Sequence, residues 1–172
     1  MPIPDIKPTD FLVESIDDEV RADRLCGELL MEFYRELQTD GGDPEVATGL
    51  ARSADYFTRD FLIGAQQWYL FDETRSPVRP FAGTWYIITT LEPSIAELTG
   101  HLAGILSFYR YLARHGLISS SFLATVDAEC SDHAYYEQRI RSFWEITGDG
   151  YREWERSCPV KRSSAPGVPL TA

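Results

Sequence analysis

Two pairs of acidic and imidazole side chains have the spacing and donor types of a metal site. Glu97 precedes His101 by four residues, and Glu129 precedes His133 by the same interval. Side chains four residues apart share one face of a helix, so two such helices could hold one metal ion and support a metal-dependent enzyme. Carboxylate-bridged bundles normally use Glu-x-x-His, however, and these pairs are also ordinary surface ion pairs. The second interpretation is preferred, and no cofactor is predicted.

The chain is rich in arginine, with 14 arginines and only two lysines. Arginine binds carboxylates and phosphates bidentately, so a convergent group would bind an acidic ligand or the phosphates of nucleic acid. The alternative is that each arginine pairs with one of the chain's own carboxylates. The candidate anion-binding residues are Arg75, Arg79, Arg110 and Arg114, the last two sharing a helix face.

Aromatic residues make up 13% of the chain and occur in clusters. Tyrosine and tryptophan anchor many protein interfaces, whereas a centrally packed bundle would bury the same residues in its core. Known nucleotide-binding and hydrolase motifs are absent, so no catalytic residue is predicted. The sequence favours a non-catalytic interaction or regulatory module that uses aromatic and acidic surfaces to bind another protein or itself. Its candidate partner-binding residues are Trp68, Tyr69, Trp85, Tyr86, Tyr111 and Trp144.

The charge is unevenly distributed. With 27 acidic and 16 basic residues, the formal net charge is -11, which argues against nucleic acid binding by the chain as a whole. Residues 1–43 hold 12 acidic and four basic residues, a balance of -8, whereas the segment from Arg75 to Arg114 holds four basic and two acidic, a balance of +2. The acidity therefore lies mainly in the first helix, and nucleic acid is a less favoured partner than protein.

Local signals predict one all-α domain over residues 1–172, a bundle of five to six helices. An irregular arm, residues 1–15, should precede a first helix with a regular apolar face, and a second helix should run from Pro44 to about Gly64. Residues 65–92 are interpreted as helical or irregular, with a short hairpin as the alternative. Residues 121–147 form either one helix or two, residues 151–156 add a further turn, and residues 157–172 form a Pro/Ser-containing tail.

The strongest helix signal begins at Ser94. Ser94 and Glu97 fit a capping box, in which hydroxyl and carboxylate each accept a hydrogen bond from the other residue's amide. Apolar residues then follow on one face until Gly116, and Leu117 behind it has the pattern of a Schellman stop. A helix between these two signals is predicted.

Residues 79–118 resemble the SAM-like core-binding domain of phage integrases, which are tyrosine recombinases. The resemblance is carried by Pro93-Ser94, by the helix end Phe108-Tyr109-Arg110-Tyr111-Leu112 and by Gly116-Leu117-Ile118. It implies a helical architecture and an association with nucleic acid through Arg110 and Arg114. The His-x-x-Arg of the recombinase catalytic domain is missing, so the resemblance carries over no recombinase chemistry.

The sequence also predicts a compartment. Residues 1–20 lack the basic and apolar regions of a signal peptide, and the apolar stretches are too short to cross a bilayer. Cys26, Cys130 and Cys158 are widely separated and form no CxxC pair, and the first two are expected to be buried thiols. We therefore expect a cytoplasmic protein with no membrane association.

Overall fold

The computed structural model describes residues 6–158 and confirms the all-α prediction, because every regular element in that range is helical. The arm residues 1–5 and the tail residues 159–172 lie outside the described range. Its elements are a 3₁₀ turn (Pro8–Phe11), α1 (Ile16–Thr39), α2 (Pro44–Asp55), a π-helical segment (Tyr56–Ala65), α3 (Val78–Pro80), a second π-helical segment (Phe81–Trp85), α4 (Tyr86–Thr89), α5 (Ile95–Arg114), α6 (Ser120–Cys130), α7 (His133–Trp144) and α8 (Tyr151–Arg156).

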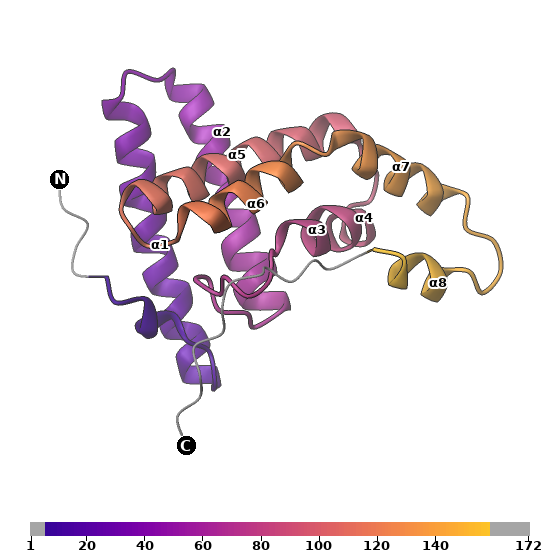
Figure 1. The fold of residues 1–172 in the computed structure, drawn as a ribbon, viewed down its shortest axis with the longest axis horizontal. Helices are drawn as coiled ribbons and strands as arrows, with labels where there is room; N and C mark the ends of the chain where they lie inside the picture. Colours follow the sequence, from indigo (N-terminus) through magenta and orange to yellow (C-terminus); the bar gives the residue numbers. More distant parts are fainter. Residues whose placement is uncertain (1–5, 159–172) are drawn as a thin grey trace.

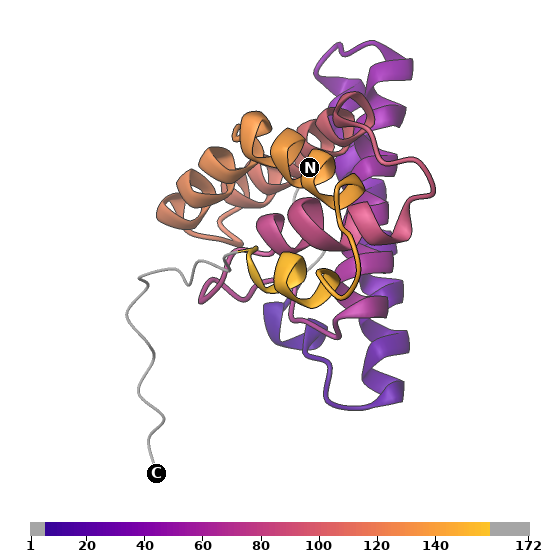
Figure 2. The same ribbon diagram turned by 90° about the vertical axis from the view of Figure 1, so that its right-hand side faces the viewer.

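Helices α1 and α2 form an antiparallel hairpin, and α5 crosses it (Figure 1). Seen from the side, the hairpin forms one edge of the molecule (Figure 2). The Ser15 hydroxyl caps α1 by accepting a hydrogen bond from the amide of Asp18 at 3.2 Å. Gly41, at φ 77°, lets the chain turn after α1, and the Asp43 carboxylate then caps α2. The hairpin is therefore specified by local signals at both ends of its loop.

The second predicted helix begins and ends close to the predicted residues, but its hydrogen bonding changes along the way. Helix α2 gives way at Tyr56 to a π-helical segment that ends at Ala65. The wider π turn directs Phe57, Phe61 and Leu62 into the core, where all three are buried. Residues 78–89 form a continuous helical run, which excludes the alternative of a hairpin across residues 65–92.

The capping box at Ser94 forms only in part. The Ser94 hydroxyl accepts from the Glu97 amide at 3.2 Å, as predicted. The reciprocal bond is replaced by Tyr86, whose hydroxyl accepts from the Ser94 amide and donates to the Glu97 carboxylate at 2.9 Å. The cap therefore depends on a residue from α4. At the other end, the Gly116 and Leu117 amides donate to the carbonyls of Ala113 and Leu112, the predicted Schellman pattern.

The C-terminal part resolves the remaining alternatives. Residues 121–147 form two helices, α6 and α7, separated at Ser131 and Asp132. The predicted turn over residues 151–156 forms as α8, and its Trp154 is buried. The arm is not irregular throughout, because the 3₁₀ turn buries Phe11 against Phe71 with the ring centroids 5.0 Å apart. The buried apolar residues of these elements form one continuous core.

Candidate partner-binding surface

The structure divides the six aromatic residues predicted to bind a partner. Tyr86 and Tyr111 are each only 1% exposed and belong to the core. Trp68, Tyr69 and Trp85 are half-buried and pack against the core. Only Trp144 of the six is well exposed, at 61%. The prediction of an aromatic surface is therefore wrong for Tyr86 and Tyr111. Tyr111 lies on the central helix α5, and Tyr86 of α4 is buried against the start of that helix.

The four candidate arginines do not gather into an anion site. Arg75 pairs with Asp72 at 3.2 Å and lies over the ring of Trp68, and Arg110 pairs with Asp127 at 3.6 Å. Arg114 pairs with Glu36. Arg79 is buried among carboxylates of α6 and the residues that follow. Pairing with the chain's own carboxylates, the stated alternative, accounts for all four.

Three of the four candidate metal ligands are engaged elsewhere, and the fourth, His133, is exposed at the start of α7. Glu97 accepts a hydrogen bond from Tyr86, and His101 lies among aromatic rings, 5.1 Å from that of Tyr56. Burial lowers the pKa of His101 and outweighs the opposing effect of Glu97. Glu129 is buried beside Arg79. Within residues 6–158 no three His, Cys, Asp or Glu side chains lie close enough to hold a metal ion, so the predicted four-ligand site does not form.

Glu129 and Arg79 form the centre of a buried charged network. Both side chains are less than 10% exposed, and the Arg79 Nε lies 3.7 Å from the Glu129 Oε1. The Ser76 hydroxyl donates to the other Glu129 oxygen at 2.6 Å, and Arg79 donates to Asp132 at 2.7 Å. The Arg79 guanidinium also lies over the ring of Tyr135, 4.4 Å from its centroid. Burial disfavours the charged arginine, but these acidic partners keep its pKa raised. The network therefore joins α3 to α6 and to Asp132 at the start of α7.

An apolar groove runs between α1 and α2. Its volume is about 460 Å³, and its floor is formed by Gly27, Leu30 and Met31 of α1 and by Ala51 of α2. Met31 is 51% exposed although it is apolar. A side chain at Gly27 would meet no other atom within 4 Å, so packing inside the protein does not require glycine there. In a helix interior, glycine costs about 0.5–1 kcal/mol relative to alanine.

Further exposed apolar side chains lie nearer the start of α1 on the face that carries the groove, separated from it by Asp23 and Arg24. Ile16 is 78% exposed and Val20 is 67% exposed. The intervals of four, seven and four residues from Ile16 through Val20 and Gly27 to Met31 place these residues on one helix face. Leu12, 39% exposed, precedes the same end of the helix. A soluble protein rarely aligns several exposed aliphatic side chains along one helix unless something covers them.

Charged residues border the groove. Arg59 of the π-helical segment binds Asp23 of α1 through two hydrogen bonds of 2.8 and 3.0 Å, and it also reaches Asp55 at 3.2 Å. These bonds raise the pKa of Arg59 and hold the groove walls at a fixed separation. Helix α1 itself carries seven acidic and three basic residues, a balance of -4. The apolar surface therefore lies on an acidic helix.

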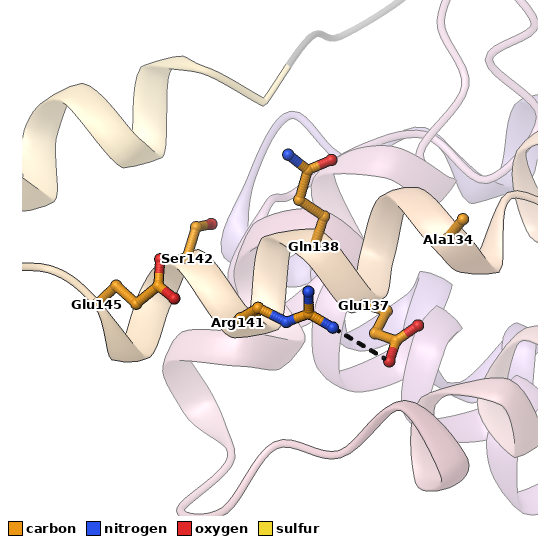
Figure 3. A pocket seen from close by; sticks show the side chains of 6 residues that line it. All are labelled: Ala134, Glu137, Gln138, Arg141, Ser142 and Glu145. Atoms are coloured by element: carbon orange, nitrogen blue, oxygen red, sulfur yellow. Dashed lines mark ion pairs between the residues drawn. The ribbon is translucent and has the colours of Figure 1, made fainter.

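A second surface depression lies on α7. Its volume is about 390 Å³, and Figure 3 shows that its side chains come from one helix and the residue that follows it. Glu137 and Arg141 form an ion pair at 3.6 Å, drawn as a dashed line. The lining is polar and no second element closes it, so this furrow has neither the apolar floor nor the second wall of the α1–α2 groove.

The cysteines differ in exposure. Cys26 and Cys130 are buried, as predicted, at 1% and 3% exposure, and Cys158 is partly exposed. Burial raises the pKa of Cys26 to about 12 and also raises that of Cys130. The thiolate is the reactive form, so we expect one thiol per folded chain, Cys158, to react quickly with DTNB. Cys158→Ser should remove the fast phase, while urea should expose the two remaining thiols. A fast phase that persists in Cys158→Ser would contradict the buried positions of the other two.

Comparisons of this chain with protein-family models, with curated proteins and with solved structures give no match. The resemblance of residues 79–118 to integrase core-binding domains therefore stays a prediction. None of the helices within residues 6–158 has both the length and the hydrophobicity needed to cross a membrane.

Sequence reasoning did not single out the α1–α2 groove. The apolar periodicity of the first helix groups Val20 with the buried Cys26, whereas in the structure Val20 is 67% exposed. The wall contributed by α2 is not visible, because it depends on how the hairpin closes.

Proposed function

We propose that the protein is a non-catalytic interaction module that binds a basic amphipathic helix of another protein along the α1–α2 groove. The observation that carries the proposal is the apolar groove with the exposed Met31 in it, on the same face of α1 as the exposed Ile16 and Val20. Helix-in-groove recognition requires such a surface, since the ligand helix buries its apolar face in it. This keeps the predicted use of an acidic surface and replaces the aromatic one with an aliphatic one.

The charge of α1 supports a partner rather than a second copy. Residues 1–43 have a balance of -8, so pairing two α1 faces would bring like charges together. A helix with lysine or arginine beside its apolar face would instead meet Asp17, which is exposed on α1 beside Ile16. Gly27 has no side chain, so a partner backbone can approach α1 closely at its middle.

The test places a photoreactive amino acid at position 31, in the groove, and separately at position 46. Val46 is 60% exposed on α2 and lies outside the groove residues, so it is a matched control. We expect cross-linking in native cells from position 31 only, to a peptide of another protein with apolar residues at helical spacing and adjacent Lys or Arg. Cross-links to a second copy of this chain, or equal cross-linking from both positions, would reject the proposal.

The identified peptide then allows a quantitative test. Met31→Glu places a charge on the groove floor and should weaken binding of that peptide by roughly tenfold or more, whereas Val46→Glu should leave it unchanged. Fluorescence polarisation with the labelled peptide measures both. Equal affinities for the two variants would place the contact surface elsewhere on the molecule.

A further inference from the structure

The wall that α2 contributes to the groove carries a free positive charge. Arg52 lines the groove and is exposed. Within residues 6–158 no carboxylate lies at ion-pair distance from its guanidinium. Arg59, the other arginine of the groove, is by contrast bound to Asp23 and Asp55. The charge of Arg52 is therefore available to a ligand, whereas that of Arg59 is already neutralised.

The local sequence explains why Arg52 stays unpaired. A side chain on a helix pairs with residues three or four positions away. Asp55 is the only carboxylate at these distances from Arg52, and Arg59 holds it at 3.2 Å. The other three positions hold Thr48, Gly49 and Tyr56. Arg52 thus has no alternative partner on its own helix, and its guanidinium remains beside the apolar floor.

Negative charge gathers further along the same wall. Asp23 and Asp55 bind Arg59, and Asp60 lies close to all three, so three carboxylates face one guanidinium. Partial burial raises the pKa of Asp60, and the negative charges of Asp55 and Asp23 add to this effect while Arg59 opposes it. This end of the groove is therefore suited to a positive group on the ligand, and the Arg52 end is suited to a negative one.

We infer that Arg52 determines the specificity of the groove by selecting a ligand helix with a carboxylate on the edge that faces α2, about two turns from its basic residues. This rests on the proposed function, since it describes the ligand of the same groove. The spacing follows from the wall, because eight residues, about two helical turns, separate Arg52 from Asp60. Arginine can hold a carboxylate through two parallel hydrogen bonds, so the pair fixes the register of the ligand as well as its charge. A uniformly basic helix would instead place a like charge against Arg52, which opposes binding.

The test selects ligands from a defined library. Helical peptides with leucine fixed along one face and the flanking positions randomised are displayed on phage and selected against the full chain at low ionic strength. Peptides that bind the wild type but not Met31→Glu are groove ligands. We expect them to carry Asp or Glu at one flanking position and Lys or Arg about two turns away. Selection against Arg52→Glu should replace that acidic residue with Lys or Arg.

The outcomes separate this inference from the proposed function. If no selected peptide depends on Met31, the groove does not bind helices, and both the function and the inference fail. If groove ligands are obtained without an acidic residue, or if Arg52→Glu selects the same residues as the wild type, the groove is still a helix-binding site. The role of Arg52 is then overturned on its own.

A charge exchange with one selected peptide measures the contact by fluorescence polarisation. Arg52→Glu should weaken binding by roughly tenfold, and replacing the acidic residue of the peptide with lysine should restore most of the affinity for this variant. Because Arg52 is exposed, Arg52→Glu should unfold at nearly the same urea concentration as the wild type. A lysine peptide that binds Arg52→Glu no better than the original peptide would contradict direct pairing.

Arg152→Glu is the matched control. Arg152 is exposed on α8, lies outside the groove and has no ion-pair partner within the described part of the chain. Its reversal changes the net charge by the same amount as Arg52→Glu and should leave the affinity of the peptide unchanged. An equal loss of affinity in both variants would show that only net charge matters, and the inference would fail.

Discussion

Arg79→Met is expected to lower the free energy of unfolding by about 3–5 kcal/mol, as measured by urea denaturation. The substitution leaves the Glu129 carboxylate, whose side chain is 4% exposed, without its buried cation. A buried charge that loses its partner has no water to replace it, and the Ser76 hydroxyl supplies only one hydrogen bond. The stacking of Arg79 on Tyr135 is lost as well.

Two further variants distinguish this explanation from a general effect of losing an arginine. Arg75→Met removes an ion pair whose arginine is 42% exposed, so it should cost no more than about 1 kcal/mol. Adding Glu129→Gln to Arg79→Met removes the stranded charge and should restore most of the lost stability, since neutral replacements of buried pairs are often tolerated. A double variant no more stable than Arg79→Met would show that the ion pair is not the cause.

Alanine at two glycines of α5, one turn apart, is expected to change stability in opposite directions. A Cβ at Gly104 would lie 2.4 Å from the Cβ of Ser53 and 2.7 Å from the carbonyl oxygen of Leu50. Both contacts are with α2, and one of them is with backbone, so the helices would have to move apart. Gly104→Ala should therefore lower the free energy of unfolding by about 1–3 kcal/mol.

Gly100→Ala is the matched control. A Cβ at Gly100 would meet nothing within 4 Å, so alanine should stabilise the helix by about 0.5–1 kcal/mol through its higher helix propensity. Urea denaturation of both variants measures the difference in sign. If Gly104→Ala also stabilised the protein, the contact between α5 and α2 at Gly104 would be looser than the distances to Ser53 and Leu50 indicate.

Several elements could be predicted because their signals act within a few residues. The Ser94 cap, the Gly116 stop and the turn after α1 depend on backbone amides and carbonyls close in sequence to the residues that satisfy them. Capping also shows the limit of such reasoning. The Glu97 carboxylate was predicted to reach back to Ser94, and the hydroxyl of Tyr86 takes that place because α4 packs beside the start of α5.

The exposure and the partners of the predicted site residues could not be predicted from local signals. Arg75 and Arg79 lie four residues apart and look equivalent in the sequence, but one is well exposed and the other is buried beneath α6. The same holds for the aromatic residues, since Tyr86 is buried in the core whereas Trp144 is exposed on the surface. Residue type gives the chemistry that a side chain can perform, whereas its partners and its exposure depend on contacts between distant segments.

The sequence by itself determined the helical class, most of the helix ends and the concentration of acidic charge in the first helix, because periodicity, caps and charge are properties of neighbouring residues. Tertiary structure alone decided the rest. The crossing of α5 over α2 buried the aromatic residues, and the closure of the α1–α2 hairpin formed the groove. The meeting of the α1 and α5 ends paired Glu36 with Arg114 and His115. Each of these features joins residues far apart in the chain, and burial is set by that packing.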